Sequence, residues 1–330
     1  MKIIKLFLLF SLVLWADFKL DVPENIYPSQ LDNIVANGWS DSNASLNRLI
    51  VTTAKSVMPV MLEKMKQPVL KGIVTKEEPF PIANIVLSKD DYLFIVAYIK
   101  YLEHNKEIDE AKKLYLELYE GLSSIEDKSF LALLFRMVEE KVVTVGLIEG
   151  LEKNHYSKAM KQELSRKIHP LLDYEDYYDA IEYEKKSIME MVKVTLLTKN
   201  KDTTVEENKL MEEVYYSFGI YVNMYFEKMM EANRVSMQEN NKKALDSYSL
   251  YMEKEREEHM SLGNQIFFAS SGLMVKMKSL LSISTESYGF FAEFMGKTNA
   301  LVAIPLISST SLDYVDLVEK NTKLLEKLQR

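Results

Sequence analysis

The stretch DDYLFIVAYIKYLEHNKEIDEAKKLYLELYEGL, residues 90–122, decides the fold. In its first half, apolar residues recur at three- and four-residue spacing and cover most of the helix circumference, which is typical of a helix buried between neighbours. The second half carries one apolar face opposite a charged one. The polar run His104-Asn105-Lys106 interrupts the pattern between them. The stretch therefore predicts two antiparallel helices joined by a short turn.

The residues at its ends predict where the first helix starts and stops. Asp90 is a residue type favoured as an N-cap, because its side chain accepts hydrogen bonds from the first helical turn. Asn105 follows the last apolar residues and tolerates the left-handed conformation that often ends a helix. We therefore expect a helix between Asp90 and Asn105 that is buried on both sides.

The hairpin resembles a tetratricopeptide (TPR) helix pair. Leu102, Ile108, Ala111 and Tyr115 stand where that motif places apolar, small and aromatic residues. Ile99 stands where the motif has a small residue, and the closing proline of the motif is absent. The resemblance implies hairpins stacked as an array, which takes about three or more units. A generic hairpin in a helical core would show the same pattern, so both interpretations stay open.

The N-terminus has the anatomy of a secretory signal. Lys2 and Lys5 precede an apolar run over residues 6–15, and Ala16 offers a cleavage point. The run is well under the ~20 residues that a helix needs to span a bilayer. We therefore expect residues 1–16 to be a signal peptide and the chain to be exported, either periplasmic or secreted. An uncleaved N-terminal membrane anchor is the alternative.

Composition argues against several classes of function. The chain contains no cysteine, which removes disulfides, thiol catalysis and cysteine-based zinc sites. With 41 basic and 49 acidic residues, its formal net charge is −8. Binding to nucleic acid depends on a basic surface that neutralises phosphates, so we expect no nucleic-acid partner.

Helical periodicity continues through most of the chain. Only ten glycines occur, and no segment alternates convincingly as a half-buried strand would. The pattern predicts an all-α protein whose helical hairpins pack as an irregular array or a large bundle. Further helices are expected at about residues 43–66, 127–152, 157–168, 174–198, 205–234 and 242–260.

Breaks in the pattern predict the domain organisation. Residues 17–42 contain Pro23, Pro28 and Gly38 and predict an irregular lead-in, and residues 67–89 contain three prolines and predict a hinge. The polar residues 199–204 predict a boundary between an N-terminal helical region, residues 43–199, and a C-terminal helical region, residues 200–330.

Apolar residues become denser toward the C-terminus. A buried core explains this, and peripheral contact with a membrane is the alternative. Charged residues such as Lys276 and Glu293 exclude an uninterrupted membrane span. In the order of its segments, the chain is similar to exported all-helical proteins of bacteria, a similarity that implies no activity.

Motifs for a metal or catalytic site are sparse. Glu152-x-x-His155 is one Glu-x-x-His pair, whereas a di-metal carboxylate bundle needs two such pairs and two further glutamates. Glu255 and His259 share a helical face, but their surroundings are charged and predict a solvated surface. No lipase-type, zinc-protease, phosphate-loop or dinucleotide motif occurs. We expect no enzymatic activity, no cofactor and no metal.

Three methionines share one face of a predicted helix. Met58, Met61 and Met65 could bind copper through their thioethers, since the chain is expected to be exported. They also continue an apolar stripe, and methionine is a common core residue. We expect them to pack in a core.

Acidic and aromatic residues concentrate near residue 175. Tyr174, Tyr177, Tyr178 and Glu182 form a candidate patch for contact with a protein, because exposed tyrosine is favoured at interfaces. Acidic residues at a helix start also complement the helix dipole, which is the alternative explanation.

A second aromatic group lies on one later helix. Phe218, Tyr221, Tyr225 and Phe226 could line a cavity for an apolar ligand, and they could equally form an ordinary core.

Two functions follow from these patterns. The first is a non-enzymatic scaffold that binds an unidentified protein partner, and the alternative is a carrier or sensor of an apolar small molecule. The oligomeric state is not predicted.

Overall fold

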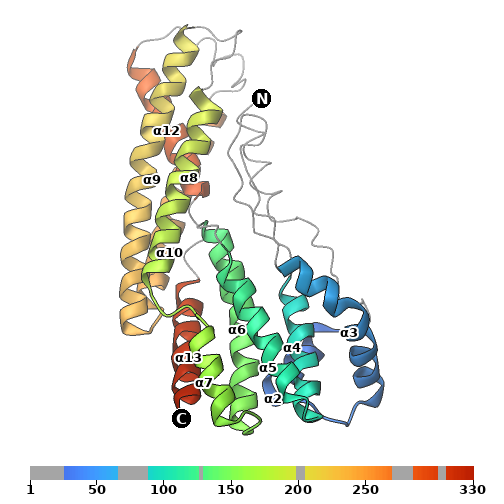
Figure 1. Cartoon of the computed structure of the whole chain (residues 1–330). Helices are drawn as coiled ribbons and strands as arrows, with labels where there is room; N and C mark the ends of the chain where they lie inside the picture. Colours follow the sequence, from blue (N-terminus) through green and yellow to red (C-terminus); the bar gives the residue numbers. More distant parts are fainter. Residues whose placement is uncertain (1–25, 66–87, 126–128, 198–204, 270–284, 304–309) are drawn as a thin grey trace. The chain divides into compact units, whose positions relative to one another are not determined.

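The computed structural model describes residues 26–65, 88–125, 129–197, 205–269, 285–303 and 310–330 (Figure 1). Within these ranges the chain forms eleven helices and no strand, which confirms the predicted all-α class. None of the described helices is long and apolar enough to cross a membrane. The signal segment 1–16 and nearly all of the predicted hinge lie outside the described residues.

The helices follow one another along the chain. They are α2 (Pro28–Asn37), α3 (Ala44–Met65), α4 (Lys89–His104), α5 (Ile108–Ser123), α6 (Phe130–Glu152), α7 (Lys158–Lys167), α8 (Glu175–Leu197), α9 (Val205–Glu239), α10 (Lys243–Ala269), α12 (Thr285–Ala303) and α13 (Ser311–Gln329).

The helices divide into two compact units. The first unit holds the described residues up to Asp173 together with Asp316–Arg330, and the second unit runs from Tyr174 to Val315. This division differs from the expected boundary at residues 199–204, which falls between α8 and α9. Because α8 packs directly on α9, the polar break there connects two neighbouring helices of the second unit.

Helix α2 lies in the segment for which the composition predicted an irregular lead-in. Pro28 occupies its first turn, where a missing backbone N–H costs nothing, and the backbone N–H of Tyr27 donates to the side chain of Gln30 at 3.4 Å. Its apolar face, formed by Leu31, Ile34 and Val35, is buried. The proline therefore starts a helix here, and the prediction of an irregular segment is wrong for residues 28–37.

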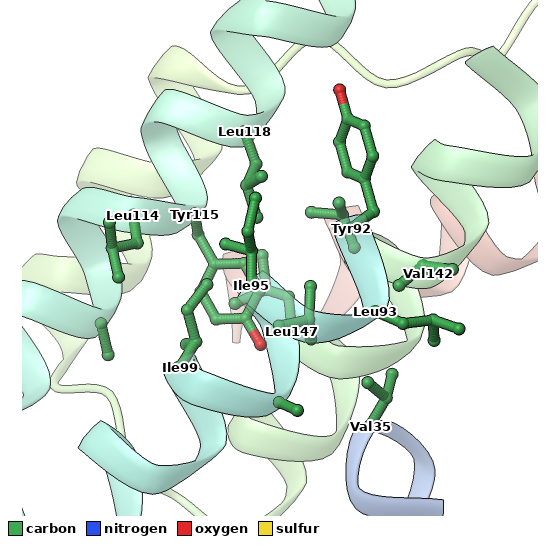
Figure 2. Close-up of a cluster of buried hydrophobic side chains, with 14 of the residues drawn as sticks. Val35, Tyr92, Leu93, Ile95, Ile99, Leu114, Tyr115, Leu118, Val142 and Leu147 are labelled. Atoms are coloured by element: carbon green, nitrogen blue, oxygen red, sulfur yellow. The ribbon is translucent and has the colours of Figure 1, made fainter. Parts of the chain in front are cut away.

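Helix α4 lies at the centre of the first unit. It packs against α2, α3, α5 and α6, and Figure 2 shows its side chains meeting Val35 of α2, Leu118 of α5 and Leu147 of α6. Every residue from Tyr92 to Ala97 is at most 4% exposed. The expectation that this helix is buried on both sides is confirmed.

The N-cap of α4 differs from the expected residue, whereas its C-cap is Asn105 as expected but without the left-handed conformation. Ser88 is the N-cap: its hydroxyl accepts the backbone N–H of Asp91 at 3.3 Å, and its own N–H donates to the Asp91 carboxylate at 2.7 Å. At the other end Asn105 keeps φ at −82°, and Lys106 takes the left-handed conformation at φ 66°. The side chain of Asn105 instead donates to the carbonyl of Tyr101 at 2.9 Å.

A buried polar network fixes the C-terminal part of α13 in the first unit. The Asn321 amide donates to Glu140 at 2.6 Å and to the carbonyl of Leu171 at 2.8 Å, and it accepts the hydroxyl of Thr144 at 2.8 Å. Leu324 and Leu328 of α13 are buried in the core of the first unit. Each polar atom of the network thus gains a partner when α13 docks.

The second unit is built around the long helix α9. Helices α8, α10 and α12 all pack on it, and α10 also touches α12 (Figure 1). Phe218, Tyr225, Phe226 and Met229 on the inner side of α9 are fully buried. Gly296 of α12 lies so close to α9 that an added Cβ would stand 2.6 Å from the backbone nitrogen of Phe218. The absence of a side chain at Gly296 therefore permits the close approach of α9 and α12.

Candidate functional site

An open groove of about 540 Å³ lies between α9 and α12. We call it the α9/α12 groove. Its described lining consists of Lys209, Glu212, Glu213, Tyr216, Ser217, Ile220 and Tyr221 on α9 and Gly289, Ala292 and Glu293 on α12. The α9 residues recur in adjacent pairs at intervals of one helical turn, so they share one face of the helix. Two of the three α12 residues, Gly289 and Ala292, are small and leave the groove open.

Two large apolar side chains in this groove are exposed. Tyr216 is 73% exposed and Ile220, one helical turn further, is 51% exposed. Carboxylates flank them, because Glu212 and Glu213 precede Tyr216 on α9 and Glu293 lies opposite on α12. The arrangement offers apolar contact area beside negative charge.

The inner wall of the groove is held by a hydrogen bond between the two helices. The Tyr221 hydroxyl donates to Glu293 at 2.7 Å. Burial and this hydrogen bond together raise the pKa of Tyr221 to about 12. The phenol therefore stays neutral and keeps its proton for Glu293 at physiological pH.

Glu255 and Lys297 form a second set of charges near Tyr221. Glu255 of α10 accepts the Tyr225 hydroxyl at 3.0 Å and pairs with Lys297 of α12 at 2.8 Å. The Lys297 ammonium also stands 5.6 Å from the centre of the Tyr221 ring, close enough for a cation–π contact. Burial acts to raise the pKa of Glu255, but the hydrogen bonds from Lys297 and Tyr225 outweigh it, so that pKa lies below its ordinary value.

The four residues proposed for an apolar cavity are divided between two sides of α9. Phe218, Tyr225 and Phe226 are fully buried in the second unit and do not line the groove. Tyr221 does line it. The core interpretation thus describes three of the four residues, while the exposed apolar surface of the groove comes from Tyr216 and Ile220, which lie outside these four.

The candidate patch near residue 175 is only partly exposed. Tyr177 is fully buried, shares a hydrogen bond with Thr310 at 2.9 Å and packs its ring 5.3 Å from that of Tyr314. Tyr174, Tyr178 and Glu182 are half-buried. Tyr177 therefore serves packing within the second unit, and contact of its neighbours with a protein stays a prediction.

In neither of the two Glu/His pairs considered for metal binding do the glutamate and the histidine share a partner within the part of the chain that the structure describes. Glu152 pairs with Lys323 and Lys327 of α13 at 3.1 Å, while His155 lines a cavity. The ring of His259 lies 2.8 Å from the Thr298 hydroxyl and stacks on Phe294. Among the described residues no three His, Asp or Glu side chains are placed to hold a metal ion together.

The methionine face of α3 is buried where the structure describes it. Met58 is 7% exposed and Met61 is 1% exposed, and both belong to the core of the first unit. The side chain of Met65 lies outside the described residues. Core packing thus accounts for Met58 and Met61.

The first unit contains a buried ionic cluster that the sequence interpretation missed. Lys100 of α4 is 1% exposed, and its ammonium lies 2.7 Å from both Glu103 and Glu149 and donates to the carbonyl of Gly146. Glu103 also accepts the Tyr156 hydroxyl at 2.5 Å. The sequence signal that could have revealed this cluster is the presence of Lys100 and Glu103 in a helix that is apolar on almost every side.

A cavity of about 100 Å³ adjoins this cluster, and we call it the polar cavity. Its lining consists of Gly38, Trp39, Lys100, Glu103, His104, Lys106, Glu149, Lys153 and His155. Burial acts to raise the pKa of Glu149, but the charges of Lys100 and Lys153 outweigh it and lower that pKa. Burial lowers the pKa of His155.

The chain matches no protein-family model, no curated protein and no solved structure. The α9/α12 groove and the polar cavity are therefore the features from which its function can be inferred.

Proposed function

We propose that the protein is an exported, non-enzymatic interaction module that binds a partner protein in the α9/α12 groove. The observation that carries this proposal is the exposure of Tyr216 and Ile220 within a hollow formed by two packed helices. Residues 1–16 support the exported location through their signal-like sequence.

The chemistry of the groove suits a protein segment. Tyrosine is among the residues that contribute most to protein interfaces, because it offers a large rigid surface with a polar tip. An exposed Ile220 beside it extends the apolar contact by one helical turn. A partner that covers both side chains would remove them from water, which is worth about 25 cal/mol for each Å² of apolar area.

The walls of the groove are fixed before any partner arrives. Gly296 permits close contact between α9 and α12, and the Tyr221–Glu293 hydrogen bond links the same two helices at the groove. A preformed site loses less conformational freedom on binding than a site that must first be ordered. The exposed residues are therefore held in a position to bind.

A protein partner fits this groove better than an apolar small molecule. Small-molecule sites are mostly enclosed and apolar, with few polar groups. The α9/α12 groove is open, and its lining includes Lys209 and three glutamates. Phe218 and Phe226, the candidates for an apolar cavity, are fully buried and do not line it.

Affinity capture with matched variants tests the proposal. The double variant Tyr216→Ser/Ile220→Ser removes the exposed apolar surface without touching the buried side of α9. Leu250→Ser is the control, because Leu250 on α10 is also exposed, at 68%, but does not line the groove. Each protein is exported in its native host and captured from the cell envelope.

The expected result is a partner that the wild type and Leu250→Ser retain at equal amounts and that the double variant loses. Circular dichroism and a melting curve establish that all three proteins are equally folded. A partner retained equally by all three would contradict the proposed site, and the absence of any reproducible partner would contradict the proposed function.

A further inference from the structure

The polar cavity lies where three helices of the first unit end. Gly38 follows the last residue of α2, His104 and Lys106 lie at the end of α4, and Lys153 and His155 lie at the end of α6. Helix C-termini carry partial negative charge on their unpaired carbonyls. Such a position by itself favours a bound cation, so the charges of the lining side chains decide what the cavity can hold.

Several of the exposed C-terminal carbonyls already have donors. The Lys153 ammonium donates to the carbonyl of Asn37 at 2.8 Å, at the end of α2. At the end of α4, Asn105 donates to Tyr101. The backbone N–H of His155 donates to Gly150 at 3.1 Å, at the end of α6. These hydrogen bonds satisfy one carbonyl group at each of the three helix ends.

The two carboxylates in the lining are buried and paired with lysines. Glu103 is 1% exposed and Glu149 is 7% exposed, and both lie against the Lys100 ammonium. Glu149 also pairs with Lys153 at 2.5 Å. Three lysines against two glutamates leave one excess positive charge among the lining side chains, and His104 of the lining lies 3.1 Å from the carboxylate of Asp41.

Two donors of the lining have no partner of their own. Among the described residues, the side chains of Lys106 and His155 form neither a hydrogen bond nor an ion pair. Lys106 is exposed and held in the left-handed conformation at φ 66°, and His155 is half-buried. Trp39 forms a wall of the same cavity, its ring 5.1 Å from that of Tyr101.

We propose that the polar cavity binds a small oxyanion, which Lys106 and His155 hold. A cavity of about 150 Å³ accommodates benzene, with its six heavy atoms. The polar cavity, at about 100 Å³, therefore fits a group of about four or five heavy atoms. Inorganic phosphate and small carboxylates share this size and the required charge. This proposal does not depend on the α9/α12 groove.

Trp39 provides a direct reporter of binding. The chain has two tryptophans, Trp15 and Trp39, so the full chain with Trp15→Phe has fluorescence from Trp39 alone. The probes are inorganic phosphate and acetate, each titrated to millimolar concentration against sodium chloride of equal ionic strength. We expect a saturable change in Trp39 fluorescence with at least one oxyanion and none with chloride. Saturation by only one of them assigns the site to phosphate or to a small carboxylate.

Two variants test the assigned donors. Lys106→Asn removes the charge and introduces a residue that tolerates the left-handed conformation, and His155→Gln keeps a polar group of similar size. Each variant should weaken binding by roughly tenfold or more, which corresponds to the loss of one charge-assisted hydrogen bond. Lys55→Asn, at an exposed position on α3 outside the lining, should bind as the wild type does.

The same titrations include the results that would overturn the proposal. A fluorescence response to phosphate and acetate that equals the response to chloride would show that the cavity holds no oxyanion. Saturable binding of unchanged strength in both Lys106→Asn and His155→Gln would place the anion elsewhere. Melting curves of every variant ensure that a lost signal reflects lost binding in a folded protein.

Discussion

Lys100 is a buried cation at the centre of the ionic cluster in the first unit. Its ammonium is surrounded by Glu103, Glu149 and the carbonyl of Gly146, and all of them are buried in α4 and α6. A complete buried ion cluster contributes little net stability, because desolvation offsets the attraction between its charges. Removing one member is different, since the remaining buried charges then have no compensation.

Replacement of Lys100 by methionine tests this argument. Lys100→Met keeps the length of the side chain and leaves two buried carboxylates without their shared cation. We expect a loss of about 3–5 kcal/mol in the free energy of unfolding, measured by urea denaturation. Lys113→Met is the control, because Lys113 is exposed and pairs only loosely with Glu117, at 4.0 Å. Equal, small losses in both variants would contradict the role of the cluster.

Glu139 gives a pH-dependent prediction. Burial, and then the charge of Asp91, raise its pKa well above the ordinary value in the folded protein. The folded state therefore holds a proton that the unfolded chain releases near its ordinary pKa, so stability falls as the pH rises from there through the raised pKa. Glu139→Gln removes this loss. Its gain in melting temperature should be larger at about pH 8 than at about pH 5. A gain that does not change with pH would contradict the argument.

At the scale of helices, the sequence predicts what depends on local pattern. The hairpin α4–α5 was expected because its apolar spacing specifies two helices and one turn, and the structure has both helices. The resemblance of this hairpin to a TPR helix pair stays a prediction. Ser88 and not Asp90 is the N-cap, because Ser88 and Asp91 exchange hydrogen bonds between their side chains and backbone N–H groups.

Contacts between distant helices were beyond what the sequence could predict. The pairing of Lys100 with Glu149 joins α4 to α6, and nothing in the spacing of either helix specifies the partner. The division of α9 has a similar cause. Tyr216 and Phe218 are both aromatic, so composition cannot tell which side of the helix faces solvent. Gly296 of α12 lies against the backbone of Phe218, so this side of α9 faces the neighbouring helix. The sequence of α9 alone does not contain this contact.

A matched pair of glycines on α12 tests the packing of the groove. An added Cβ at Gly296 would meet the backbone of Phe218 and Ser217, which cannot move aside as a side chain can. Gly296→Ala should therefore destabilise the protein by roughly 1–3 kcal/mol and reduce capture of the partner. At Gly289 nothing described lies within 4 Å, so Gly289→Ala should stabilise α12 by roughly 0.5–1 kcal/mol. Chemical denaturation measures both, and equal effects would refute the close contact.

At the scale of the whole molecule, each unit has its own core and its own site. The core of the first unit surrounds α4 and includes Leu324 of α13, and the polar cavity lies at the ends of its helices. The second unit is organised around α9 and carries the α9/α12 groove. The two proposals therefore concern separate surfaces, and a variant in one site should leave binding at the other unchanged.

Site-specific photo-crosslinking in the native host tests the central claim most directly. A photoreactive amino acid is introduced at Tyr216 in the groove, or at Leu250 on α10 as the control. The proposed function predicts a discrete crosslinked species with one partner protein from position 216 and not from position 250. No crosslinked species from position 216, or the same species from both positions, would contradict the claim that the α9/α12 groove binds a protein.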